Sequence, residues 1–127
     1  HPQITTETPT TFRQKQESGI LPIFDGVVTY SSLEHSGLGR YGDALNPWGD
    51  IVAIARAWCV TKPGGFLFMG VPTARDRIQY NAHRVYGDLR YPLITANWKY
   101  IPILGQKAAA QEVAKKHWTQ PLFRFEK

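Results

Sequence analysis

The chain has 127 residues, a net charge of +5, 43% hydrophobic residues and one cysteine. This length fits one domain with a modest core, and a mean hydropathy of -0.33 is typical of an ordinary globular protein rather than a disordered or membrane-embedded one. The sequence contains no apolar run long enough to span a bilayer and no signal-peptide pattern, and its lone cysteine excludes an intrachain disulfide.

The first segments of the chain predict little regular structure. Ile4–Thr8 is β-branched enough for a short strand, and the polar stretch Phe12–Gly19 is long enough for a short helix. Phe24–Tyr30 is a stronger signal, because its apolar residues are continuous rather than alternating. Such a run is typical of a strand whose two faces are both covered.

Glycines at positions 37, 39 and 42 then predict a loop, and Asn46-Pro47 is typical of a helix start with Asn as the N-cap. One apolar stripe follows on the predicted helix, made of Ile51, Ile54, Ala55, Trp58 and Cys59. On that stripe Cys59 is expected to act as a small hydrophobe. Lys62–Gly65 ends the helix and turns the chain into a second buried strand, Phe66–Val71. The result is a βαβ unit with parallel strands and a right-handed crossover.

The C-terminal part of the chain predicts four more elements. Ile78–Tyr86 and the alanine-rich Lys107–His117 are expected to be helices, and Tyr91–Trp98 and Pro121–Glu126 are expected to be strands. The large aromatic residues of this part are expected to pack in the core or on the sheet: Trp98, Trp118, Phe123 and Phe125.

Polar segments follow both principal strands, and ligands of open α/β sheets bind beyond the carboxyl ends of parallel strands. Tyr30–Asp43 and Pro72–Asn81 are therefore the candidate site segments. In the first, Glu34 and His35 could act as general base and partner or bind a divalent metal, and His83 could close the same site. The alternative is that they are polar loop residues that cap a helix or bond to the backbone.

The basic residues are spread along the sequence, and no basic stripe with interleaved aromatics indicates a nucleic-acid partner. Four arginines fall in or near the two candidate segments, so an anionic ligand is one interpretation and ordinary surface charge is the other. They are Arg40, Arg75, Arg77 and Arg84.

Gly37–Gly42 has the spacing G-x-G-x-x-G but does not predict a dinucleotide site. In that motif the first glycine lies in the turn directly after a strand and a helix opens at its end. Here Ser31–Ser36 intervene and the predicted helix begins only near Pro47, so these glycines predict turns in a loop.

At Phe24–His35 and Lys62–Gly65 the chain resembles the fourth strand and the turn into the fifth strand of class I S-adenosylmethionine-dependent methyltransferases. Tyr30–Asp50 together with Asn81–Gly87 resembles, more closely, a Caenorhabditis-type family of unknown function placed near those enzymes. The likeness extends over roughly residues 20–127.

The resemblance implies an α/β fold, a partial Rossmann-like sheet of the methyltransferase type with a parallel βαβ core and a C-terminal strand pair. Residues 1–127 would form a single domain of this kind, a fragment that lacks the N-terminal cofactor-binding strands, since the chain begins at His1 without an initiator methionine. Thr29, Tyr30 and Ser31 would then lie near the methyl end of S-adenosylmethionine. The implied activity is methyl transfer to an unknown substrate.

Within the same resemblance, Glu34 and His35 would be catalytic, and Glu34, His35 and His83 would hold a divalent metal. Some methyltransferases carry Glu-x-x-Glu-His after the fourth strand, and Ser31 stands at the position of their first glutamate. Two other functions stay open. The first alternative to methyl transfer is a non-catalytic binding module that keeps the fold. The second is a hydrolase or metal-dependent lyase that uses the same residues.

Overall fold

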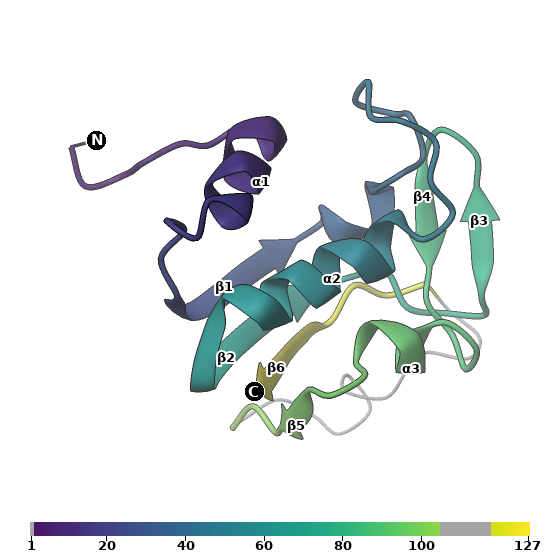
Figure 1. Cartoon of the computed structure of the whole chain (residues 1–127). Helices are drawn as coiled ribbons and strands as arrows, with labels where there is room; N and C mark the ends of the chain where they lie inside the picture. Colours follow the sequence, from purple (N-terminus) through teal and green to yellow (C-terminus); the bar gives the residue numbers. More distant parts are fainter. Residues whose placement is uncertain (1, 105–117) are drawn as a thin grey trace.

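A computed structural model describes residues 2–104 and 118–127, which form a mixed α/β protein (Figure 1). The helices are α1 (Pro9–Glu17), the 3-10 turn η1 (Leu33–His35), α2 (Gly49–Val60) and α3 (Tyr91–Ile94). The strands are β1 (Phe24–Tyr30), β2 (Thr61–Gly70), β3 (Arg77–Gln79), β4 (His83–Val85), β5 (Lys99–Ile101) and β6 (Leu122–Glu126).

The principal sheet has four strands in the order β1-β2-β6-β5. β1 and β2 are parallel and are joined through η1 and α2, so the predicted βαβ unit with parallel strands is confirmed. β6 is antiparallel to both β2 and β5, so the sheet is mixed. β3 and β4 form a separate hairpin, which stands at the end of the molecule where α2 begins (Figure 1).

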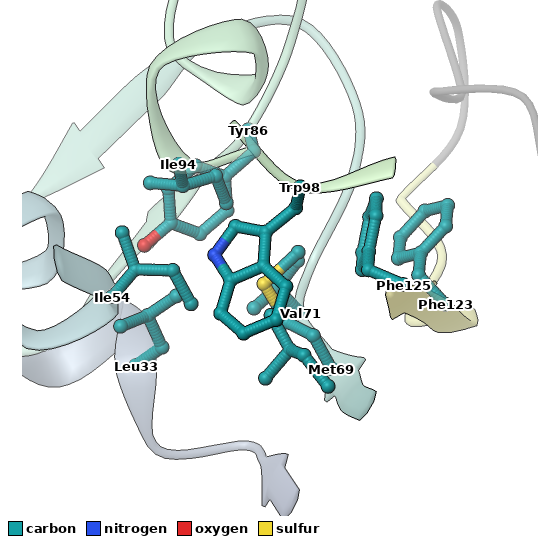
Figure 2. Packing of buried hydrophobic residues seen from close by; sticks show 10 residues of the cluster. Leu33, Ile54, Met69, Val71, Tyr86, Ile94, Trp98, Phe123 and Phe125 are labelled. Atoms are coloured by element: carbon teal, nitrogen blue, oxygen red, sulfur yellow. The ribbon is translucent and has the colours of Figure 1, made fainter. Parts of the chain in front are cut away.

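One face of the sheet packs under α2 and α3 and carries the core (Figure 1). Leu67 and Met69 of β2 are fully buried there beside Phe123 and Phe125 of β6. Figure 2 shows Trp98 at the centre of this cluster, where it also meets the ring of Trp58 edge-on at 5.2 Å between centroids. The expectation that Trp98, Phe123 and Phe125 are core residues is confirmed, whereas Trp118 is 52% exposed and that prediction was wrong.

The other face of the sheet is apolar but uncovered among the described residues. Val28 is 69% exposed and Tyr30 59% exposed, while Val27, which precedes Val28 and faces the opposite side, packs against the core. The described residues therefore bury only one face of β1, although its apolar run is continuous. Apolar composition alone cannot distinguish a buried face from an uncovered one.

The prediction of an N-terminal strand at Ile4–Thr8 was also wrong. Those residues have no regular structure, and Thr8 instead caps α1 by accepting a hydrogen bond from the backbone N–H of Thr11 at 3.1 Å. Threonine is β-branched, but its hydroxyl is also a good helix N-cap, and here the capping role wins because Pro9 follows. The short helix expected at Phe12–Gly19 is confirmed as α1, which starts earlier at Pro9.

α2 begins at Gly49 with Trp48 as its N-cap, later than the Asn46-Pro47 start that the sequence predicted. The Asn46 side chain accepts a hydrogen bond from the Trp48 N–H at 2.9 Å, so it closes a turn before the helix. Of the predicted stripe, Ile54 is buried and Ile51 and Trp58 are half-buried, but Ala55 and Cys59 are exposed. The assignment of Cys59 to the buried face was therefore wrong.

The Lys62–Gly65 turn lies inside β2 as a bulge. Phe24 pairs with Thr61 and Gly26 with Phe66, so the intervening residues of β2 loop out of the ladder. Gly64 supplies the left-handed conformation that this excursion needs, with φ at +74°. The predicted Phe66–Val71 strand is confirmed as the regular part of β2, which ends at Gly70.

Two C-terminal predictions were wrong and one lies outside the described residues. Ile78–Tyr86 is the β3–β4 hairpin rather than a helix, because Asn81 at φ +53° reverses the chain. Tyr91–Trp98 is not a strand, because it begins with the short helix α3, whose first turn accommodates Pro92. The strand β5 starts only at Lys99. The strand expected at Pro121–Glu126 is confirmed as β6, and the Lys107–His117 helix falls in the part that is not described.

Candidate functional site

A cavity opens at the carboxyl end of β1, where the parallel pair places its ligand-facing loops. Its volume is about 560 Å³, within the range of small-molecule sites. The end of β1, η1, the following loop and the first half of α2 supply its walls. The polar residues of its lining include Ser31, Ser32, His35, Asp43, Asn46 and Arg56.

His35 is held at this cavity by a backbone carbonyl from the β3–β4 hairpin. Its Nδ1 lies 2.5 Å from the carbonyl oxygen of Ala82. Because a carbonyl oxygen can only accept, Nδ1 must carry the proton and donate. In the neutral imidazole the lone pair is therefore on Nε2, the tautomer that a general base needs. This contact also bears out part of the alternative interpretation, that His35 bonds to backbone.

Glu34 lies beside His35 but is only 1% exposed. Its Oε1 is 3.7 Å from Nε2 of His35, and its Oε2 is buried with no hydrogen-bond partner among the described residues. A carboxylate at this distance can orient the imidazole, so Glu34 can support His35 as a base. Burial also keeps Glu34 from direct contact with a ligand in solvent.

His83 comes from β4 and meets His35 edge-on, with 6.4 Å between ring centroids. Burial lowers the pKa of His83, and the positive charges of His35, Arg77 and Arg40 lower it further, against the opposing effect of Glu34. The fold thus brings Glu34, His35 and His83 together as the sequence predicted. In the described part of the chain, however, no three His, Cys, Asp or Glu side chains are arranged to hold a metal ion. The metal-binding role of these three residues stays a prediction.

The three residues expected at the cofactor do not converge on one point. Ser31 lines the cavity, with an unusual left-handed backbone at φ +50°. Tyr30 lies on the uncovered face of the sheet, with its ring against Gly70, and strand alternation puts Thr29 on the opposite face. Of the three, only Ser31 borders the cavity.

The four candidate arginines separate into two kinds. Arg84 is completely buried and donates hydrogen bonds to the carbonyl oxygens of Ser36 at 2.5 Å and Asn46 at 3.2 Å, so it holds the loop together. Arg40, Arg75 and Arg77 are exposed. Arg40 lies over the ring of Tyr41 and reaches the Ala82 carbonyl at 3.5 Å.

Sequence reasoning missed the polar network behind the cavity, which centres on Asp50. Asp50 is fully buried in the first turn of α2 and accepts hydrogen bonds from Arg90 and from the hydroxyl of Tyr86. Burial alone would raise the pKa of Asp50, but hydrogen bonds from Arg90 and the charges of Arg84 and Arg90 hold that pKa below its ordinary value. The available signal was an acid in a predicted first helical turn, which usually indicates only a favourable helix dipole.

The described residues thus define a mixed α/β protein with a cavity at the end of a parallel strand pair, and no described helix is long and apolar enough to cross a membrane. The family model described as Caenorhabditis protein of unknown function, DUF268, matches residues 3–123, and the chain belongs to that family. Searches of curated proteins and of solved structures found no significant match.

Proposed function

We propose that the chain is the C-terminal part of an S-adenosylmethionine-dependent methyltransferase that acts on an unknown substrate. The observation that carries this proposal is the arrangement of the sheet. A parallel β1–α2–β2 unit is followed by an antiparallel pair beside β2, as the resemblance implies, and a cavity lies at the carboxyl end of β1.

The residues present fit the reactive end of this cofactor better than its other parts. Ser31, Ser32 and His35 border a cavity of suitable size and would face the methyl end of the bound cofactor. None of the described strands ends in a glycine-rich turn that opens a helix. In nucleotide-binding folds such a turn binds the cofactor. The proposal therefore assigns only the reactive end to described residues.

The bound cofactor supplies an electrophilic methyl group. At the cavity, His35 accepts the proton of the substrate nucleophile at Nε2, since Nδ1 is committed to the Ala82 carbonyl. Glu34, 3.7 Å from that nitrogen, stabilises the imidazolium that results. The divalent metal is not needed for these steps, and none of them uses it.

The test is isothermal titration calorimetry with S-adenosylhomocysteine, on this chain and on the full natural polypeptide. Ala44 borders the cavity and Ala55 borders a separate apolar groove on the far side of α2, and both are exposed. Ala44→Trp should weaken binding about tenfold or more by filling the cavity, while Ala55→Trp should leave it unchanged. No binding by the full polypeptide would overturn the proposal.

A second candidate is a non-catalytic module that keeps this fold. The observation that favours it is that Thr29 and Tyr30 point to opposite faces of the sheet. Of the three residues expected at the cofactor, only Ser31 therefore borders the cavity. This candidate predicts that no methyl transfer can be measured with any nucleophile. Methyl transfer that is abolished by His35→Ala would exclude it.

A further inference from the structure

The rim of the candidate site is lined by positive groups that come from two distant parts of the chain. His35 and Arg40 both reach the carbonyl oxygen of Ala82, at 2.5 Å and 3.5 Å, so the loop after β1 is fastened to the tip of the β3–β4 hairpin. The ring of Tyr41 meets His35 edge-on at 5.5 Å and supports the guanidinium of Arg40. These contacts fix Arg40 next to the two imidazoles.

Arg77 approaches the same place from the hairpin. In the β3–β4 ladder Arg77 pairs with Val85 and Gln79 pairs with His83, so Arg77 and His83 lie on one face as diagonal neighbours. A long arginine side chain can span that spacing. The register of the hairpin, rather than a direct contact, therefore places Arg77 on the same face as His83.

No described carboxylate neutralises Arg40 or Arg77 by an ion pair. The nearby acids are already used. Glu34 is buried against His35, and Asp43 accepts backbone N–H groups of Gly37 and Tyr41. By contrast, Arg84 and Arg90 both form ion pairs with Asp50 in the network behind the cavity.

We propose that Arg40, Arg77 and His83 bind an oxyanion group of the substrate, a carboxylate or a phosphate, beside the imidazole of His35. Guanidinium groups match the geometry of such anions, and an imidazole adds a donor that strengthens when protonated. The assignment to the substrate rests on the proposed methyl transfer, whereas binding of the anion itself does not. This location would hold the anionic part of the substrate within reach of the base.

The experiment is an NMR titration of the His35 and His83 imidazole signals with inorganic phosphate and, separately, with acetate, at constant ionic strength set by chloride. A bound oxyanion should shift the His83 signals saturably and raise the pKa of His83, because it favours the imidazolium. The Arg40→Gln/Arg77→Gln double variant should bind about tenfold more weakly or worse, since two charge-assisted contacts are lost. Arg13→Gln, an equivalent change at an exposed arginine of α1, should bind like the parent chain.

Saturation by phosphate or by acetate, lost in the double variant, supports the proposal and identifies the group. Absence of saturation with both anions, or equal binding by the double variant and Arg13→Gln, would overturn it. Calorimetry with S-adenosylhomocysteine separates this result from the proposed function. If the anion binds and the cofactor product does not, the oxyanion site stands and methyl transfer falls.

Discussion

Arg90 clasps Asp50 with two hydrogen bonds, from Nε to Oδ2 at 2.8 Å and from Nη2 to Oδ1 at 2.6 Å. Asp50 lies in the first turn of α2, and Arg90 directly precedes α3, so this pair joins two elements that are distant in sequence. Nη2 of Arg90 also donates to the Pro47 carbonyl at 2.6 Å. The pair therefore fixes the chain just before α2, which is one wall of the candidate cavity.

We expect the Asp50 network to control stability in acid. The folded-state pKa of Asp50 lies below its ordinary value, so its ion-pair contribution is complete above about pH 4 and is lost as pH falls through the folded pKa. Asp50→Asn should be less stable than the parent chain at about pH 7. Between about pH 5 and about pH 2, where the parent loses its ion-pair contribution, Asp50→Asn should lose less stability. Denaturation curves at stepped pH measure both effects.

Asp50→Ala should lower the free energy of unfolding by about 3 kcal/mol or more relative to the parent chain, because Arg84 and part of Arg90 would remain buried without an anion. Asp88→Asn is the control, since Asp88 is exposed and belongs to no described ion pair. Equal unfolding free energies for Asp50→Ala and Asp88→Asn would mean that the network does not stabilise the fold.

Two glycines of the loop after β1 should respond differently to alanine. Gly37 has φ +77°, and an added Cβ would lie 2.2 Å from the Asn46 carbonyl oxygen. Gly42 has φ +81° but open space around it. Gly42→Ala should cost only the backbone strain of roughly 1–2 kcal/mol, and Gly37→Ala should cost clearly more. Urea denaturation of the two variants compares them, and similar losses would contradict the close contact.

The two faces of the sheet make a direct prediction for β1 and β2. Leu67 is fully buried, so Leu67→Ala should lower the free energy of unfolding by about 2–5 kcal/mol. Val28 is 69% exposed, and Val28→Ala should change it by roughly 0.5 kcal/mol or less. Chemical denaturation gives both values. A large loss for Val28→Ala would show that something covers this face in solution.

Lys127 should stabilise the end of α2. Its Nζ donates to the carbonyl oxygens of Trp58 and Thr61, both at 2.7 Å, and lies 4.8 Å from the centre of the Trp58 ring. Lys127→Met should destabilise the protein by about 1–2 kcal/mol, through loss of the cap and of the cation–π contact. Lys99→Met is the matched control at an exposed lysine. Thermal unfolding should separate the two variants, and matching midpoints would rule out the cap.

The pKa of His83 offers a test of the charges around the candidate site. Burial lowers it first, the charge of Arg77 contributes to the decrease, and Glu34 opposes it. Arg77→Gln should therefore raise the pKa of His83, and Glu34→Gln should lower it further. NMR titration of the imidazole signals resolves both shifts. Shifts of the same sign in the two variants would refute this arrangement.

Local sequence signals were sufficient where one strong pattern acted alone. The β-branched apolar run of Phe24–Tyr30 is β1 in full, and the glycine pair before Phe66 marks the bulge that leads into the regular part of β2. The placement of Glu34, His35 and His83 in one site also followed, because the carboxyl ends of parallel strands share an edge.

Predictions failed where a distant contact chose between two local options. Ile78–Tyr86 contains enough apolar residues for a helix, but it forms the β3–β4 hairpin, from which Arg84 donates to the carbonyl oxygens of Ser36 and Asn46. Cys59 has the spacing of a buried helix residue, yet the helix is rotated so that Ile54 and Val60 face the sheet. Periodicity gives the stripe and tertiary packing gives its orientation.

By itself the sequence determined the parallel β1–α2–β2 unit and the polar segment at its carboxyl end, because those features follow from short-range propensity and chain connectivity. Only the tertiary structure decided which arginines are structural and which are available to a ligand. Arg84 is buried near Asp50, whereas Arg40 and Arg77 keep their charge at the surface. The reason is physical, since a buried charge requires a partner, and that partner lies far away in the sequence.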